Sequence, residues 1–261
     1  MKKTPIERIP FALPPEIERL VLKGMVYDSS CSPEARVYFI DCDGGLYLKI
    51  APRGTLAKEA SLTSYFHKKG LGVEVLFYAS QEQDFLLTAA AKGEDCTHRR
   101  YLDDPQRLCD TLAEHLRALH ELDASDCPEQ DRMRSYLALA DENYRAGKYD
   151  LSLFSPQMTF RTPEEAYAAL ARGRGELISE VLLHGDYCLP NVILDDWRLS
   201  SFIDLGNGGV GDRHVDLFWG AWTLWFNLGT DQYRNRFFDA YGRDRIDPER
   251  LLTVCAAEVF G

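Results

Sequence analysis

The chain has 261 residues, of which 45% are hydrophobic and 27% are charged, and its formal net charge is −11. This composition is typical of a globular protein and excludes collagen-like and low-complexity chains. An acidic chain is poorly suited to neutralising nucleic-acid phosphates, so we expect no nucleic-acid partner.

The cysteine pattern and the apolar segments indicate a cytoplasmic protein. The seven cysteines are scattered and form no C-x-x-C pair, so we expect neither a disulfide framework nor a zinc site. Residues 1–17 carry two lysines without the apolar stretch of a signal peptide behind them. The longest uncharged run near the end, residues 217–230, is shorter than the roughly 20 residues that cross a bilayer. We therefore expect no membrane partner. We also expect the protein to be a monomer or a weak dimer.

The first third of the chain has the pattern of a β-sheet. Short runs rich in β-branched and aromatic residues alternate with Gly, Asp and Pro, which predicts strands. The turn sequence "CDGG" predicts that the first two strands form a hairpin. One helix, ended by Gly70, interrupts the strands. The strands are predicted at 35–42, 45–52, 73–80 and 84–91, and the helix at about 55–69.

The pattern becomes helical from about residue 94. Asp104 is a predicted N-cap followed by Pro105 at the first helical position, and Thr162 begins a similar segment. Only residues 182–206 interrupt this part with strands. The fold class is therefore α+β, with a β-rich lobe at 1–88, a hinge at 89–93 and a mostly helical lobe at 94–261. The helices are predicted at 104–122, 162–173, 214–226, 231–242 and 247–260.

Three polar residues lie at the ends of strand-like runs in "LLHGDYCLPNVILDDWRLSSFIDLG", residues 182–206. A hairpin over this segment would bring Asn191, before one strand, close to Asp204, after the other. Their oxygens suit Mg²⁺, and Asp186 in the preceding loop would be free to accept a proton. Taken singly, each residue is more often a turn or cap residue. The combined spacing H-G-D-x-x-x-x-N and I-D-x-G favours a functional site.

A lysine and a glutamate in the β-rich part provide independent support. Lys49 lies inside the apolar strand "LYLKIAP", where it would either extend to solvent or pair with an acid. Glu59 lies on the apolar face of the following helix, where a carboxylate is costly unless it is paired. The two residues are natural partners, and such a pair would direct the ammonium toward an anion such as a nucleotide phosphate.

Together these motifs resemble the aminoglycoside phosphotransferases, most closely the 3′-phosphotransferase branch. The resemblance covers nearly the whole chain and is carried by "HGDYCLPNVIL", "FIDLG", "YLKI" and the Glu59 helix. It implies a bilobal, protein-kinase-like fold and ATP-dependent phosphorylation of an aminoglycoside hydroxyl, which confers antibiotic resistance. By this resemblance Asp186 is the catalytic base, Asn191 and Asp204 hold Mg²⁺, and Lys49, steadied by Glu59, contacts the α- and β-phosphates.

The resemblance also implies nucleotide and substrate contacts. Residues 29–38 match the family's nucleotide loop, and residues 86–93 resemble its hinge. Hydroxyl and N–H groups for the β-phosphate would come from Ser29, Ser30 and Ser32, and main-chain groups for adenine from Ala89 and Ala91. Substrate contacts would come from Asp186, Glu258, Phe260 and Asn227. The chain departs from the family's acid-rich pocket, because residues 152–158 contain no carboxylate and Phe226 and Asn227 stand where a relative has two acids.

Several alternatives remain open from the sequence. GTP could replace ATP, and the acceptor could be another small hydroxylated or amino metabolite. A non-catalytic nucleotide-binding sensor is a further alternative. We interpret His115, His120 and His184 as structural, with His184 bracing its loop through main-chain hydrogen bonds. The aromatic residues 219, 222, 225 and 226 have helical spacing typical of core, although Trp225 and Phe226 could line a sugar pocket.

Overall fold

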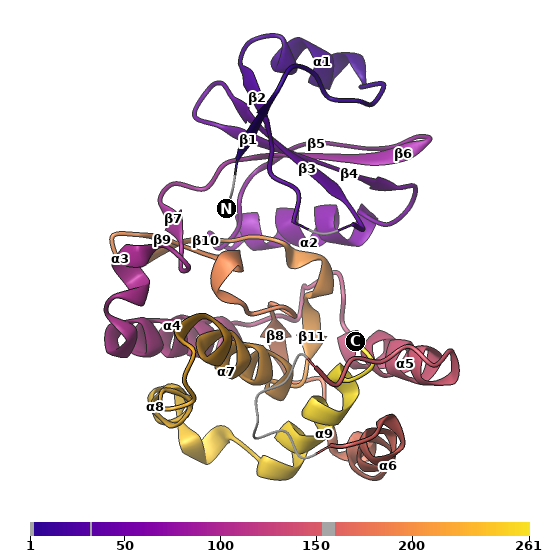
Figure 1. Ribbon diagram of the computed structural model, residues 1–261, viewed down its shortest axis with the longest axis vertical. Coiled ribbons are helices and arrows are strands. Elements are labelled where there is room, and N and C mark those ends of the chain that lie inside the picture. Colours follow the sequence, from indigo (N-terminus) through magenta and orange to yellow (C-terminus); the bar gives the residue numbers. More distant parts are fainter. Residues whose placement is uncertain (1–2, 32, 153–159) are drawn as a thin grey trace. The chain divides into compact units, whose positions relative to one another are not determined.

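The computed structural model describes residues 3–31, 33–152 and 160–261 (Figure 1). Packing divides the chain into two compact units. Unit 1 consists of Met1–Asp95 with Ile193–Gly206, and unit 2 of Cys96–Val192 with Asn207–Gly261. The lobe boundaries at 1–88, 89–93 and 94–261 remain a prediction. In the structure, residues 193–206 belong to the same unit as the N-terminal residues.

Unit 1 is built on a six-stranded sheet in the order β1-β2-β3-β4-β6-β5. Every neighbouring pair in it is antiparallel. The four strands predicted from residues 35–91 are confirmed, whereas β1 and β2 were not predicted. The bounds are β1 Thr4–Ile6, β2 Met25–Asp28, β3 Arg36–Asp41, β4 Leu46–Pro52, β5 Val75–Ser80 and β6 Gln83–Ala89.

Each face of this sheet is covered by apolar side chains. On one face, Ile17 of helix α1 (Pro15–Val21) packs with Leu48 and Ile50 of β4. On the other, Ala60 of helix α2 (Ala57–Lys68) packs with Ala51 of the same strand. The alternation along β4 therefore assigns successive residues to different cores, as the strand period requires.

A second, small sheet in the order β10-β9-β7 contains the predicted hairpin. The hairpin strands are β9 (Val192–Asp195) and β10 (Arg198–Phe202), and β7 (Glu94–Asp95) pairs antiparallel with β9. Asp196 and Trp197 form the turn with φ angles of 49° and 67°. The predicted hairpin is therefore confirmed. Asn191 directly precedes its first strand, and Asp204 follows its second strand.

Unit 2 is mostly helical, with one short antiparallel strand pair, β8 (Val181–Leu183) and β11 (Gly209–Gly211). The predicted caps are confirmed, because the side chains of Asp104 and Thr162 accept hydrogen bonds from main-chain N–H groups of α4 and α6. Helix α5 was not predicted. The helices are α3 Arg99–Leu102, α4 Pro105–His120, α5 Arg132–Arg145, α6 Pro163–Gly173, α7 His214–Leu228, α8 Arg234–Tyr241 and α9 Pro248–Glu258. Short 3₁₀ turns occur at Arg174–Glu176, Leu189–Asn191, Leu205–Asn207 and Arg243–Arg245.

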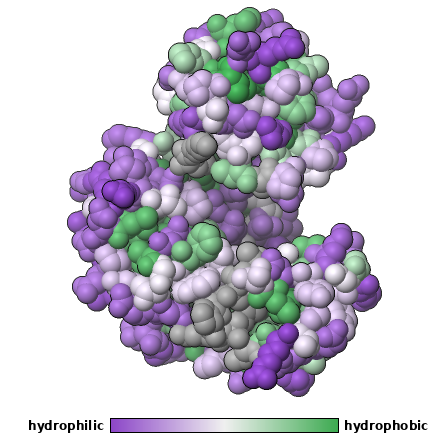
Figure 2. All heavy atoms as spheres, in the orientation of Figure 1, coloured by the Kyte–Doolittle hydropathy of each residue, from purple (hydrophilic) through white to green (hydrophobic). Residues whose placement is uncertain are grey.

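The core of unit 2 joins helices α5, α6, α7 and α9 to strand β8. Leu170, Leu183 and Val254 are fully buried in it. On the face drawn in Figure 2, hydrophilic residues predominate and hydrophobic residues form small groups. Within the described ranges, none of the helices combines the length and apolar character that crossing a membrane requires.

Candidate functional site

Lys49 of unit 1 binds two carboxylates. Its Nζ atom lies 2.8 Å from Glu59 Oε2 and 2.7 Å from Asp204 Oδ1. The predicted pairing of Lys49 with Glu59 therefore forms, and Asp204 joins it. The side chains of Lys49 and Glu59 are 22% and 11% exposed, whereas that of Asp204 is 50% exposed. The cluster thus has a shielded ion pair on one side and an accessible carboxylate on the other.

The electrostatics of this cluster follow from burial and charge. Burial lowers the pKa of Lys49, but the charges of Asp204 and Glu59 outweigh it and the pKa is raised. Burial raises the pKa of Glu59 against the opposing attraction of Lys49. Asp204 has a φ of 59°, a left-handed conformation that Asp tolerates better than most residues. Two carboxylates around one ammonium leave one negative charge in excess when all three are ionised.

The predicted nucleotide loop lies beside strand β3 in unit 1. The Ser30 hydroxyl accepts a hydrogen bond from Val37 N at 2.9 Å, so it extends the main-chain pairing. The Ser29 hydroxyl is buried and has no hydrogen-bond partner among the residues the structure describes. A buried hydroxyl in this state has hydrogen-bonding capacity for a ligand or water. Ser32 lies outside the described residues, as do 153–158 of the predicted acid-free loop.

The predicted hinge follows strand β6. Ala89 donates its N–H to Glu74 O at 3.0 Å, and Ala90 donates to Gly45 O at 2.9 Å. For the Ala91 N–H, no main-chain acceptor is present within the described part of the chain. The Ala91 N–H is thus a main-chain donor available for a ligand.

In unit 2, Asp186 and Asn191 are joined directly. Asn191 Nδ2 donates to Asp186 Oδ2 at 2.8 Å and to Asp186 O at 3.0 Å. His184 Nδ1 accepts from Asp186 N at 3.2 Å, so His184 braces the loop through the main chain as predicted. Gly185 has a φ of 84°, and a Cβ atom there would lie 1.9 Å from Asn207 O. The loop therefore requires glycine at this position.

Asp216 holds the same loop from helix α7. It is fully buried, and its two oxygens accept the N–H groups of His184 and Gly185 at 2.8 Å each. His120 Nε2 lies 3.1 Å from Asp216 Oδ2, and His120 Nδ1 lies 2.8 Å from Tyr241 Oη. The structural role predicted for His120 is confirmed. No role was predicted for Asp216 from the sequence, although it lies in the motif "GDRHVDL", residues 211–217.

Apart from Asp186, the residues predicted to contact substrate lie in α7 and at the end of the chain. Glu258 is 8% exposed and accepts from Tyr136 Oη at 2.8 Å and Trp219 Nε1 at 3.2 Å. Burial raises the pKa of Glu258 to about 7. Asn227 donates to Thr223 within the helix. Phe260 is 1% exposed, and its ring packs edge to face against Tyr144 and Tyr167 in the core.

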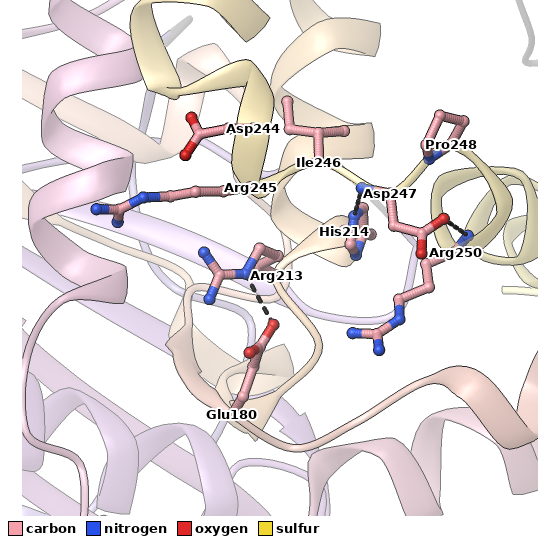
Figure 3. Close-up of a pocket in the computed structure, with 9 residues that line it drawn as sticks. All are labelled: Glu180, Arg213, His214, Asp244, Arg245, Ile246, Asp247, Pro248 and Arg250. Carbon is pink, nitrogen blue, oxygen red and sulfur yellow. Dashed lines mark hydrogen bonds and ion pairs between the residues drawn. The ribbon is translucent and has the colours of Figure 1, made fainter.

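A separate pocket of about 570 Å³ opens in unit 2 (Figure 3). Arg213, which donates to Glu180 Oε1 at 2.8 Å, connects it to the Asp216 network by donating to Tyr241 Oη at 3.3 Å. None of the residues predicted from the sequence to form the site lines this pocket. Its lining residues are Glu180, Arg213, His214, Asp244, Arg245, Ile246, Asp247, Pro248 and Arg250.

Residues 31–252 match the family model described as the phosphotransferase enzyme family. The chain belongs to the phosphotransferase enzyme family. It is therefore an enzyme that transfers a phosphate group, and the resemblance recognised from its motifs is confirmed.

Named relatives in this family are aminoglycoside 3′-phosphotransferases. A protein of Lactococcus lactis named as a probable aminoglycoside 3′-phosphotransferase is 52% identical over 257 residues, which cover 98% of this chain and 96% of the relative. An aminoglycoside 3′-phosphotransferase of Streptomyces fradiae is 34% identical over 227 residues, or 79% of this chain and 82% of the relative.

Solved structures of the family share the fold. An aminoglycoside-3′-phosphotransferase of type VIII has a TM-score of 0.75 at 25% identity, covering 89% of this chain and 92% of the other. An aminoglycoside phosphotransferase from Streptomyces rimosus, in complex with ADP and streptomycin, has a TM-score of 0.69 at 26% identity, covering 85% and 90%. The predicted α+β, protein-kinase-like fold class is confirmed.

Proposed function

We propose that this phosphotransferase moves the γ-phosphate of ATP to the 3′-hydroxyl of an aminoglycoside. The acceptor is supported by the names of its relatives, and the nucleotide by the ADP bound in the S. rimosus structure. The observation that carries the proposal is the ion-paired Lys49, which is fixed by Glu59 and in contact with the exposed carboxylate of Asp204.

Lys49 is suited to bind nucleotide phosphates. Glu59 holds its ammonium at one point, which reduces the conformational freedom that a ligand would otherwise have to restrict. Lys49 then neutralises the α- and β-phosphates, and Ser29, Ser30 and Ser32 offer hydroxyl and N–H groups to the β-phosphate. Main-chain groups of Ala89 and Ala91 bind adenine.

The donor set also fits Mg²⁺. The Lys49 cluster has one negative charge in excess when all three groups are ionised, and the carboxylate of Asp204 is its exposed part. Asn191 directs its amide nitrogen to Asp186, which leaves its Oδ1 atom for a cation. No group of three or more His, Cys, Asp or Glu suited to a metal occurs among the described residues. Mg²⁺ is commonly held by one or two protein oxygens plus substrate phosphates, and Asp204 in unit 1 and Asn191 in unit 2 each offer an oxygen of this kind. Bound Mg²⁺ supplies charge neutralisation to the phosphate oxygens.

Asp186 acts on the acceptor hydroxyl. Its carboxylate, oriented by Asn191, accepts the hydroxyl proton as the hydroxyl oxygen bonds to the γ-phosphorus. The bond from the γ-phosphorus to the β–γ bridging oxygen breaks, and ADP leaves with that electron pair. Asp216 keeps the loop in place through its two main-chain contacts. Glu258 and Asn227 provide polar groups for the amino sugar, while the ring of Phe260 packs in the core of unit 2.

A phosphate-transfer assay tests this function. Purified protein is given ATP or GTP with Mg²⁺ and a panel of kanamycin- and neomycin-type aminoglycosides, and ADP or GDP release is measured. We expect transfer that requires Mg²⁺, is absent for 3′-deoxy analogues and falls at least about 100-fold in Asp186→Asn.

The same assay separates the alternatives. Transfer to 3′-deoxy compounds at an equal rate would contradict the 3′ assignment alone. Nucleotide binding without transfer to any aminoglycoside would contradict the proposal and favour another small hydroxylated acceptor. Nucleotide binding that remains without transfer across a broader acceptor panel would favour a sensor.

A further inference from the structure

A row of three aromatic rings runs along helix α7. The rings of Trp222 and Phe226 are stacked, with centroids 4.9 Å apart and planes at 14°. Trp219 meets Trp222 edge to face at 5.3 Å. Phe226 is 62% exposed, whereas Trp219 and Trp222 are partly buried against the core of unit 2. The row thus passes from the core to an open aromatic surface at Phe226.

The inner end of the row touches a buried acid. Trp219 Nε1 donates to Glu258 Oε1 at 3.2 Å, and Tyr136 Oη donates to the same oxygen at 2.8 Å. The other oxygen, Oε2, receives no hydrogen bond from any residue that the structure describes. A carboxylate oxygen with this free capacity can accept from a cationic donor.

Beside the middle ring of the row, helix α7 is joined to the loop of Asp186. Thr223, next to Trp222, accepts the main-chain N–H of Leu189 at 3.0 Å, and Asn227 donates to the Thr223 hydroxyl at 3.2 Å. The charge of Asp186 contributes to raising the pKa of Glu258, behind the larger effect of burial. Helix α7, which carries the ring stack, therefore contacts both Glu258 and the loop that contains Asp186.

The exposed ring and the buried acid are chemically suited to an amino sugar. The C–H face of a sugar ring packs on an aromatic ring, and an ammonium group is attracted to the ring face. The net charge of −11 favours a cationic ligand. Two rings are far too small for a stable protein interface, which buries about 800 Å² on each partner.

We propose that Trp222 and Phe226 form a stacking platform for an amino-sugar ring of the acceptor, with Glu258 at its inner end. This inference rests on the proposed aminoglycoside phosphotransfer and specifies how the acceptor is held. Binding of the acceptor would depend on ring stacking and cation–π attraction. In a pocket lined by carboxylates, binding would instead depend on ion pairs.

Substitution of the exposed ring tests the platform. In Phe226→Ala, we expect the KM for the aminoglycoside to rise about 5- to 20-fold, while the KM for the nucleotide and kcat stay nearly unchanged. Phe226→Tyr retains a ring and should keep the wild-type KM, and Phe226→Lys should weaken binding further by repelling the cation. Leu139→Ala is the matched control, because Leu139 is 44% exposed on α5 and lies outside the row.

The outcomes distinguish this inference from the proposed function. If wild-type protein transfers phosphate but Phe226→Ala behaves like Leu139→Ala, the platform is overturned and the function stands. If wild-type protein transfers no phosphate, calorimetry with neomycin tests the platform directly. Binding that weakens in Phe226→Ala and is retained in Phe226→Tyr supports it, and absence of binding overturns it.

Discussion

Lys49 and Asp204, 155 residues apart in the chain, are joined by an ion pair of 2.7 Å between Nζ and Oδ1. Both belong to unit 1, and Glu59 completes the cluster. Because Asp204 is half exposed while Glu59 is shielded, the two acids around the lysine are not equivalent. Glu59 is placed to hold the lysine, and Asp204 is the more accessible of its two partners.

Replacement of Lys49 should separate its structural and binding roles. In Lys49→Met, loss of charge-assisted contacts should weaken ATP binding about 10- to 100-fold. Glu59 is left without its partner, so the free energy of unfolding should fall by about 3 kcal/mol. Nucleotide titration and urea denaturation measure the two effects.

Two further variants complete that experiment. Lys49→Met combined with Glu59→Leu removes the unpaired carboxylate and should recover stability without recovering ATP binding. Lys92→Met is the control, because Lys92 forms an ion pair with Asp195 but is 83% exposed. We expect it to change stability by less than about 1 kcal/mol. Nucleotide affinity that returned in the double variant would contradict the role proposed for Lys49.

Asp186→Asn should remove catalysis with little change in nucleotide affinity. The amide keeps the shape of the carboxylate and can still accept from Asn191 Nδ2, but it cannot take the hydroxyl proton. We expect kcat to fall about 100- to 10,000-fold. Steady-state kinetics, with a melting temperature within a few degrees of wild type, provide the measurement. An unchanged kcat would rule out Asp186 as the base.

Glu258 should make stability depend on pH. Its pKa is about 7 in the folded protein, compared with an ordinary value of 4.5. Between these values the folded state retains a proton that the unfolded state has lost, so stability falls as pH rises from about 4.5 to 7. Relative to Glu258→Gln, the wild-type free energy of unfolding should decrease by up to about 3 kcal/mol from pH 4.5 to pH 8.

Urea denaturation of both proteins at several pH values measures this difference. Glu249→Gln, at an exposed position in the first turn of the same helix, is the control and should follow the wild-type curve. Parallel curves for wild type and Glu258→Gln would show that Glu258 titrates normally.

A methyl group at position 185 should disrupt the Asp186 loop. Gly185→Ala combines a positive φ with a Cβ position 1.9 Å from Asn207 O. We expect at least about 2 kcal/mol of destabilisation or loss of folding. Gly175→Ala is the matched control, because a Cβ atom there meets nothing within 4 Å. Calorimetric melting compares the two, and equal melting temperatures would show that the loop relaxes freely.

The elements that local pattern determines were predictable. Strand β4 and helix α4 carry clear periodicity, and Asp104 with Pro105 marks a helix start that the structure confirms. The pairing of Lys49 with Glu59 was also predictable, because an acid on an apolar helix face needs a partner.

What the sequence did not reveal depends on contacts distant in the chain. Asp216 looks like an ordinary acid in a first helical turn, yet it binds main-chain groups 31 and 32 residues away. Helix α5 has a mixed polar sequence, and its Tyr136 donates a hydrogen bond to Glu258, which lies 122 residues further along the chain. No local pattern shows that Phe260 is buried, because its core is assembled from helices of separate segments.

Neither compact unit is encoded by one continuous stretch of chain. The backbone passes from one unit to the other after Asp95, after Val192 and after Gly206. A fragment that ends at residue 95 would lack both the β9–β10 hairpin and the second carboxylate beside Lys49. Dissection of this enzyme into independently folding halves therefore cannot be achieved by a single cut, and a circular permutant or a grafted hairpin would be needed to obtain either half intact.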